Sequence, residues 1–340
     1  MKLPEPTTSI ASLIDASLES RPDGVRAHLG CSLLGHPCDR WLWLSFRNAV
    51  VEAFPGRILR VFRRGQNEEA HVVNDLRSIG VNVTATGKEQ SRVDFGAHVS
   101  GSVDGIVTNI PQAPKAKAIL EIKTHSDKSF KAVVKDGVEK AHFKHYVQMQ
   151  LYMKGMDLDR ALYYAVNKND DSIYTEWLHY SADVANKYVA RGHRITLSDR
   201  MPEPLSADPS WYECKFCAGY ELCHEKAPTK EVNCRTCAMS TPLSDSTWHC
   251  AKWDDIVPTK AQSDACTGHV LHPDLVPWQR RSTDDEWQAI YIINGREVRN
   301  GEPGDGVFSS KEILANPSAC AAGDKKIMEL RKQFNGEIVG

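Results

Sequence analysis

Hydrophobic and polar positions along the chain follow two periods, and each period predicts one type of element. Helices are predicted where apolar residues recur three or four positions apart, in 57–79, 142–156 and 181–198. Strands are predicted where apolar and polar residues alternate, in 81–110 (two strands), 118–124, 161–166 and 172–180. The polar, proline-containing segment 111–117 predicts a loop. This order of helices and strands is typical of a mixed α/β core.

Composition and charge narrow the class of protein. The chain has 340 residues, of which 41% are hydrophobic and 25% are charged, as in folded globular proteins. Because the net charge is only -2, any contact with nucleic acid must come from a local basic patch. No apolar run approaches the roughly 18 residues of a membrane span, and the start of the chain lacks the pattern of a secretory signal. We therefore expect a cytoplasmic protein (in the host cytoplasm if it is phage-encoded) without a membrane partner.

The predicted strand 118–124 carries two charged residues on one face. Side chains two positions apart on a strand point the same way, so Glu121 and Lys123 project together. Asp104 ends the preceding strand, and antiparallel pairing would bring it beside Glu121. Two carboxylates can hold Mg²⁺ or Mn²⁺ for phosphodiester hydrolysis, and a lysine can orient the attacking water. A hairpin turn at Asp104 and a solvent-exposed strand edge are the ordinary alternative interpretation.

Together with two helical motifs, these residues resemble the PD-(D/E)XK nuclease superfamily in its RecB-like branch. The family's pattern is Gly-x-x-x-Glu on a helix, an Asp, Glu-x-Lys on a strand and then Gln-x-x-x-Tyr on a helix. The matching residues are Gly65, Glu69, Asp104, Glu121, Ile122, Lys123, Gln148 and Tyr152. Glu68, next to Glu69, could be mistaken for the family's glutamate, and a solvent-facing helix turn is the alternative for both.

The resemblance implies a role for each of these residues. The implied ligands of Mg²⁺ or Mn²⁺ are Glu69, Asp104, Glu121 and the carbonyl of Ile122. Lys123 would activate the water, and Gln148 and Tyr152 would support the site or the DNA.

Most of the ten cysteines lie in the carboxy-terminal part of the chain and form two groups. In the first, Cys214, Cys217 and Cys223 have the spacing C-x2-C-x5-C and need a fourth ligand from elsewhere. This arrangement resembles the [4Fe–4S] staple of AddB-type and CRISPR-adaptation RecB-like nucleases, which implies Cys38 as the fourth ligand. Cys31 is the rival for that place, and zinc is the rival metal for the same four thiolates.

The second group has a C-x2-C pair followed by two later cysteines, which is typical of a closed structural zinc site. Its members are Cys234, Cys237, Cys250 and Cys266. His249 and His269 are alternatives for the later positions. A module this small would depend on zinc for its folded state.

The sequence thus predicts an α/β, restriction-endonuclease-like mixed central sheet flanked by helices, with an iron–sulfur segment and a zinc module. The predicted domains are an N-terminal helical segment with one cluster cysteine at 1–56, the nuclease core at 57–200, the iron–sulfur segment at 201–230, the zinc module at 231–277 and a small strand-and-turn element at 278–340.

Basic residues flank the predicted site and indicate contacts with DNA phosphates. Four arginines cluster from Arg57 to Arg64, and lysines recur between Lys115 and Lys154. We expect a metal-dependent DNA exonuclease of recombination or repair, acting on ends or single strands with little base specificity. A recombination or single-strand-binding protein is a candidate partner. The alternatives are a structure-selective or restriction-like endonuclease and a non-catalytic DNA-binding recombination partner with structural metals.

Overall fold

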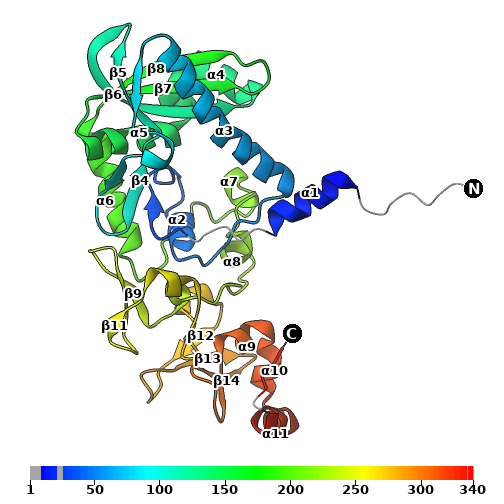
Figure 1. Ribbon diagram of the computed structural model, residues 1–340. Coiled ribbons are helices and arrows are strands. Elements are labelled where there is room, and N and C mark those ends of the chain that lie inside the picture. The colour runs from blue at the N-terminus through cyan, green and yellow to red at the C-terminus, as the bar shows by residue number, and fades with distance from the viewer. Residues whose placement is uncertain (1–8, 21–25, 335, 340) are drawn as a thin grey trace, which may run out of the picture.

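The computed structural model describes residues 9–20, 26–334 and 336–339 (Figure 1). The largest sheet lies at the top of Figure 1, the small carboxy-terminal sheets lie at the bottom, and short helices lie between them. None of the helices in the described parts of the chain is long and apolar enough to cross a membrane.

A five-stranded mixed sheet forms the centre of the predicted core. Its spatial order is β2-β5-β6-β7-β8, and only β6 and β7 run parallel. The strands are β2 (Asn82–Thr84), β5 (Gly105–Ile110), β6 (Ala113–His125), β7 (Arg160–Asn167) and β8 (Ile173–His179). The expectation of a mixed α/β core is therefore confirmed.

Helices cover both faces of this sheet. They are α3 (Gly56–Ser78), α4 (Asp127–Ala141) and α5 (Phe143–Met156), and α6 (Ala182–Thr196) packs against α5 and β4 (Val99–Ser102). On one face Val73 and Leu76 of α3 pack with Leu120 of β6. On the other face Val147 of α5 packs with Ile119 of β6. Because both faces are covered, any polar side chain in the middle of β6 is buried as well.

Three features of the core differ from the sequence prediction. Strand β6 begins at Ala113, so the predicted loop 111–117 shrinks to a two-residue turn. Helix α4 was not predicted from the sequence, and it is kinked at Gly137, which has a φ of 74°. The predicted strand through Asp104 is two strands in two different sheets, with Asp104 in the break between them.

A second, three-stranded sheet joins the core to the amino-terminal part. Its order is β1-β4-β3, so residues 29–30 pair with a strand of the core segment. The elements here are α1 (Ile10–Glu19), β1 (Leu29–Gly30), α2 (Asp39–Phe46), β3 (Arg92–Asp94) and β4 (Val99–Ser102). The predicted segment 1–56 also includes residues 1–8 and 21–25, which lie outside the described residues.

The carboxy-terminal part contains short helices and two small sheets. Its helices are α7 (Tyr212–Lys215), α8 (Tyr220–His224), α9 (Ser310–Ala315), α10 (Pro317–Ala322) and α11 (Lys325–Phe334). The sheet β11-β10-β9 consists of β9 (Ser240–Pro242), β10 (Trp248–Cys250) and β11 (Asp255–Ile256). The sheet β12-β13-β14-β15 consists of β12 (Gln279–Arg281), β13 (Ala289–Ile293), β14 (Arg296–Asn300) and β15 (Val307–Phe308). Short 3-10 turns lie at Gly87–Glu89, Cys234–Thr236, Thr259–Ser263 and Pro273–Leu275.

The last two predicted domains, 231–277 and 278–340, share one hydrophobic core. Leu271 and Tyr291 belong to the same buried cluster, and the Tyr291 hydroxyl donates to the Leu271 carbonyl at 2.6 Å. The boundary predicted after residue 277 therefore passes through a packed interior.

Trp248 of β10 connects the carboxy-terminal part to α2. Its ring is fully buried and stacks on Phe46 with ring centroids 5.3 Å apart. The guanidinium groups of Arg47 and Arg235 lie 5.5 and 5.7 Å from the Trp248 ring. Such contacts contribute both apolar burial and cation–π attraction.

We predict that Trp248→Ala lowers the free energy of unfolding by about 3–5 kcal/mol, because it leaves a cavity between α2 and β10. Chemical denaturation followed by circular dichroism measures this loss. The matched control is Trp253→Ala, which removes an exposed ring and should change stability by less than about 0.5 kcal/mol. Equal losses in the two variants would contradict the proposed role of Trp248.

Candidate active site

Strand β6 places Glu121 and Lys123 on the face that α4 and α5 cover. Glu121 is fully buried, and Lys123 is partly exposed at 25% of its side chain. The two side chains form an ion pair. Ile122, between them, points to the opposite face and packs in the cluster under α3. The alternation predicted from the sequence is therefore present, but the two charges lie inside the protein rather than on a solvated edge.

Asp104 lies beside Glu121 because of the strand register. Gly105 pairs with Leu120 in the antiparallel β5–β6 ladder, so the preceding Asp104 comes next to Glu121. One carboxylate oxygen of Asp104 accepts a hydrogen bond of 2.9 Å from the Ile122 N–H. The break between β4 and β5 leaves that N–H free for a side chain, which fixes the carboxylate of Asp104 against β6.

Helix α3 brings a third carboxylate, Glu69, to this place. Burial and the neighbouring Asp104 carboxylate raise the pKa of Glu69. Glu68 lies elsewhere and acts on Tyr164, whose pKa is raised by burial and by nearby acidic groups that include Glu68. Of the two adjacent glutamates, Glu69 is therefore the one that faces Asp104.

Gly65 lies where α3 approaches β6. A Cβ atom at this position would lie 3.4 Å from the Thr124 hydroxyl oxygen of β6, which is an ordinary van der Waals distance. Packing alone therefore does not require the glycine of the Gly-x-x-x-Glu motif.

The Glu121 carboxylate lies in an unusual environment. Burial and the neighbouring Asp104 carboxylate raise its pKa from 4.5 to about 8. Apart from the Lys123 ammonium, with which it forms an ion pair, neither of its oxygens has a hydrogen-bond partner among the described residues. Although burial by itself lowers the pKa of Lys123, the carboxylates of Glu121 and Asp104 raise it overall, so the lysine is charged. A buried carboxylate with a single ammonium as its donor is costly, and a bound cation would relieve that cost.

Gln148 and Tyr152 form a buried pair behind Glu121. The Gln148 amide nitrogen donates to the Tyr152 hydroxyl at 3.0 Å, and both side chains are buried. The Tyr152 pKa is raised by burial and by the Glu121 carboxylate. A Cβ atom at Gly101 would lie 2.8 Å from the Tyr152 ring, so glycine is required there. Of the two roles expected for this pair, its burial fits support of the site better than contact with DNA.

A network of histidines lies on the same face of β6 and was not predicted as part of the site. The Tyr163 hydroxyl lies 2.7 Å from His125 Nε2 and 2.9 Å from His145 Nδ1. Ser129 lies 2.8 Å from His125 Nδ1 and 3.0 Å from His142 Nε2. The signal in the sequence was His125, which stands two positions after Lys123 and therefore shares its face.

His125 and His145 are neutral at physiological pH. Burial and the charge of Lys123 lower the pKa of His145 to about 2, and burial and His142 lower the pKa of His125 to about 4. These two rings therefore supply hydrogen bonds rather than positive charge near Lys123.

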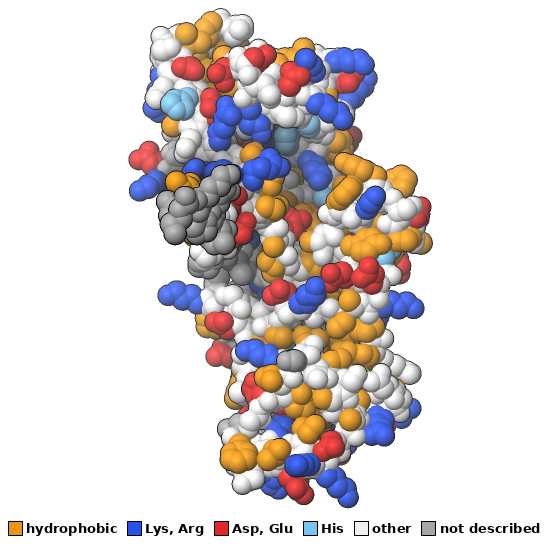
Figure 2. Space-filling view, turned by 90° about the vertical axis from the view of Figure 1, so that its right-hand side faces the viewer, with side chains coloured by type: hydrophobic (Ala, Val, Ile, Leu, Met, Phe, Trp, Pro, Cys, Tyr) orange, Lys and Arg blue, Asp and Glu red, His pale blue; other side chains and the backbone are white. Residues whose placement is uncertain are grey.

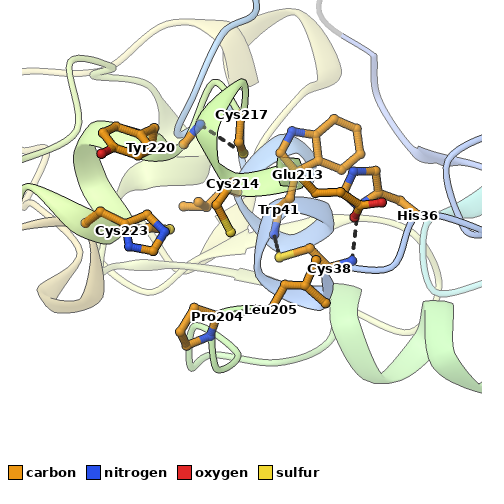
Figure 3. Close-up of a pocket in the computed structure, with 13 residues that line it drawn as sticks. His36, Cys38, Trp41, Pro204, Leu205, Glu213, Cys214, Cys217, Tyr220 and Cys223 are labelled. Atoms are coloured by element: carbon orange, nitrogen blue, oxygen red, sulfur yellow. Dashed lines mark hydrogen bonds between the residues drawn. The ribbon is translucent and has the colours of Figure 1, made fainter. Parts of the chain in front are cut away.

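The first group of cysteines surrounds one pocket. Cys38, Cys214, Cys217 and Cys223 all line it (Figure 3). The Cys38 sulfur accepts the Trp41 N–H at 3.3 Å, and the Cys217 sulfur accepts the Gly219 N–H at 3.4 Å.

Cys31, the rival of Cys38 for the upstream place, lies elsewhere. It is fully buried beside Gly101 and Tyr152 and does not line this pocket.

The second group of cysteines lines another pocket. Its members there are Cys234, Cys237, Cys250 and Cys266. The Cys237 sulfur accepts two backbone N–H groups, from Met239 and Val270, each at 3.4 Å. Backbone N–H groups directed at sulfur are what a thiolate ligand of a metal requires.

The two alternative histidines differ from these cysteines. His269 lines the second pocket, but its Nδ1 lies 2.7 Å from the Ser310 hydroxyl and its Nε2 lies 3.0 Å from the Asn233 carbonyl. His249 pairs with Asp254 instead. Both ring nitrogens of His269 are thus already engaged.

In the described part of the chain, no three His, Cys, Asp or Glu side chains lie close enough together to hold a single metal ion as they stand. The residues predicted for each of the three sites, magnesium or manganese, iron–sulfur and zinc, lie near one another. The metals themselves stay predictions.

Comparison with known proteins gives a limited likeness. No protein-family model matches the chain, and no curated protein matches it. Solved structures that it resembles include an alkaline exonuclease from Laribacter hongkongensis (LHK-Exo), with 15% identity and a TM-score of 0.38 over 50% of this chain and 87% of that one. SSO0001 has 16% identity and a TM-score of 0.39 over 63% of this chain and 95% of that one. A phage-related exonuclease from Haemophilus somnus 129PT has 18% identity and a TM-score of 0.32 over 50% of this chain and 93% of that one.

These neighbours include exonucleases, one of them also solved in complex with dAMP. With TM-scores below 0.5, this likeness does not assign an activity to the chain.

We predict that Glu121→Gln stabilises the metal-free protein, and that the gain grows with pH. Folding raises the pKa of Glu121 from 4.5 to about 8. The stability contributed by its protonated form is therefore present below about pH 4.5 and is lost as the pH rises through about 8. The glutamine does not titrate, so its advantage in melting temperature should be larger at pH 8 than at pH 5.

Thermal melting in EDTA at both pH values measures this difference. Glu68→Gln is the matched control, since Glu68 lies outside the cluster, and it should show no such trend. If Glu121→Gln raised the melting temperature by the same amount at both pH values, the raised pKa of Glu121 would be contradicted.

Proposed function

We propose that the protein is a metal-dependent DNA nuclease, an exonuclease that acts on DNA ends or single strands in recombination or repair. The observation that carries this proposal is the buried Glu121 carboxylate, which has Lys123 as its counter-charge and Asp104 and Glu69 as acidic neighbours. A purely structural site would not keep three carboxylates together around one lysine, because their repulsion costs stability.

The donor set fits a hard divalent cation. Carboxylate oxygens are the ligands that Mg²⁺ and Mn²⁺ prefer, and Glu121 lacks other hydrogen-bond donors among the described residues. The residues that would hold the ion are Glu69, Asp104, Glu121 and the carbonyl of Ile122. Such an ion lowers the pKa of a bound water and neutralises the charge that develops on the phosphate.

The protein's own residues would perform the remaining tasks. Lys123, held beside Glu121, would orient the attacking water and offset negative charge on the phosphate. Asp104 is fixed by the Ile122 N–H, so its free oxygen points in a defined direction. Gln148 and Tyr152 would keep Glu121 in place from behind.

Basic side chains near the site support DNA as the substrate. Figure 2 shows Lys and Arg side chains gathered over the upper part of one face. Arg63 and Arg64 of α3 are exposed, and Arg64 donates to the Lys168 carbonyl at 3.0 Å. These groups would bind phosphates without reading bases. A recombination or single-strand-binding protein stays the candidate protein partner.

Two structural cofactors belong to this proposal. A [4Fe–4S] cluster would be held by Cys38, Cys214, Cys217 and Cys223, which line one pocket. A zinc ion would be held by Cys234, Cys237, Cys250 and Cys266, which line another. In both pockets backbone N–H groups already point at sulfur, and this supports thiolate ligands rather than buried free thiols.

We predict that Asp104→Ala, Glu121→Ala and Lys123→Ala each lower cleavage of end-labelled linear DNA by at least about 100-fold in Mg²⁺ or Mn²⁺. The groups would act as one unit, so a double variant should be little worse than a single one. Glu68→Ala is the matched control and should cleave normally. Near-normal turnover in any of the three variants would show that the substituted residue is not part of the active site.

The form of the DNA separates the alternatives. Degradation of linear DNA with no cut in closed circles supports the exonuclease. Nicking of circles would select the endonuclease instead. DNA binding without any metal-dependent cleavage would select the non-catalytic recombination partner.

We also predict that anaerobically purified protein is brown, with broad absorbance near about 400 nm as in Fe–S proteins, and that Cys217→Ala removes the colour. Cys234→Ser is the matched variant: it should lose zinc and keep the colour, because its sulfur lines the other pocket. Iron and zinc analysis of both variants completes the test. A colourless wild-type protein that contains two zinc ions would show that zinc, and not a cluster, is bound by the first group of cysteines.

A further inference from the structure

Three aromatic side chains around α7 are exposed to solvent. Trp211 is 51% exposed, Tyr212 is 74% exposed and Phe216 is 79% exposed. Single exposed rings are ordinary on a protein surface, whereas several that are close together mark a candidate site for a ligand or partner. Figure 2 shows hydrophobic side chains gathered at mid-height of the molecule, the level at which α7 and α8 lie in Figure 1.

The opposite side of the same short segment faces the first cysteine pocket. Cys214 lies inside α7 and is buried, and Cys217 follows one turn later (Figure 3). The Cys214 N–H donates to the Trp211 carbonyl at 3.0 Å, and the Cys217 N–H donates to the Cys214 carbonyl at 3.0 Å. The inward cysteines therefore hold a compact turn whose outward side carries the rings. Rings presented by a fixed turn lose little entropy when they bind a ligand.

A cation accompanies the rings. The Lys215 ammonium lies 5.7 Å from the centre of the Phe216 ring. Lys215 is exposed and forms no ion pair with any described residue, whereas Lys230 nearby pairs with Glu221. Glu213, the acidic residue between the rings, is also exposed, and it lines the cysteine pocket beside His36 (Figure 3). The outward side thus combines π-faces with one available positive charge.

We propose that Trp211, Tyr212 and Phe216 form a stacking platform for unpaired bases of single-stranded DNA, with Lys215 contacting the phosphate backbone. Alternation of aromatic and basic side chains is the signature of single-strand binding, because every base has a face that can stack on a ring. Aromatic rings also occur in protein interfaces, and the lysine beside these rings is the feature that favours a nucleic-acid strand.

The platform is linked to the catalytic strand through packed segments. The loop before Cys38 touches the start of α5, since a Cβ atom at Gly35 would overlap the Lys144 backbone. The next residue, His145, belongs to the network beside Lys123. The platform therefore deepens the proposed nuclease function, on which it rests, by assigning a place for the unpaired strand.

The test is binding of a fluorescent 20-nucleotide oligo(dT) to the full chain in EDTA, measured by anisotropy. Tyr212→Ala and Phe216→Ala should each weaken binding by about 5- to 150-fold, the range expected for loss of one stacked base. Phe216→Trp keeps an aromatic ring at this position and should bind oligo(dT) with an affinity within about twofold of wild type. The matched control is Trp253→Ala, because Trp253 is also exposed and also has a lysine, Lys252, 5.5 Å from its ring centre.

Two further substrates separate stacking from other effects. An abasic strand of the same length and a blunt duplex should bind equally well to the wild type and to both variants. If Phe216→Ala also loses the cysteine-bound cofactor, Tyr212→Ala decides, since its ring points away from the pocket.

The proposal is overturned if the wild type binds oligo(dT) and both alanine variants bind it equally well. It is also overturned if the variants change only the oligomeric state seen by light scattering, which would make this face a protein contact. Absence of metal-dependent cleavage by the wild type would reject the nuclease proposal alone, because the binding assay contains no metal and scores the platform separately.

Discussion

The buried Glu121 carboxylate is the constraint on which the architecture of the core depends. A charge at the centre of a sheet covered on both faces needs compensation, and Lys123 provides it from two positions along the same strand. Asp104 and Glu69 bring further negative charge to this place and raise the pKa of Glu121. The three carboxylates therefore repel one another at one place in the fold. The packing of α3, α4 and α5 around them offsets this repulsion.

Several local features follow from this arrangement. The chain leaves one sheet after β4 and enters another at β5, which frees Asp104 from a ladder so that it can accept the Ile122 N–H. Gly101 leaves room for the Tyr152 ring. This glycine is required by close packing next to a supporting side chain, since it does not lie at a position of positive φ.

The sequence predicted those parts of the core in which one period dominates. The alternation in β6 was sufficient to place Glu121 and Lys123 on one face, whereas Glu69 was expected only from the family resemblance, which left Glu68 as its rival. The break at Asp104 could not be predicted, because the residues on both sides of it have strand propensity and the change of sheet is decided by long-range pairing. Helix α4 was not predicted, although Phe130 and Val133 recur at helical spacing in it. The His125–Tyr163 contact could not be predicted, because it joins residues 38 positions apart.

In the cysteine-rich regions, too, local spacing predicts neighbours in sequence but not contacts between distant segments. Spacing alone grouped the cysteines correctly around two pockets, since C-x2-C pairs are local, but the place of Cys38 depends on how α2 packs against α7 and α8. Asp39 at the start of α2 pairs with Arg191 and Arg194 of α6, and Trp43 donates to the Ser198 carbonyl. These contacts hold α2 against the core independently of any metal. Because α2 is positioned in this way, protein contacts alone bring Cys38 to the pocket that the other three cysteines line.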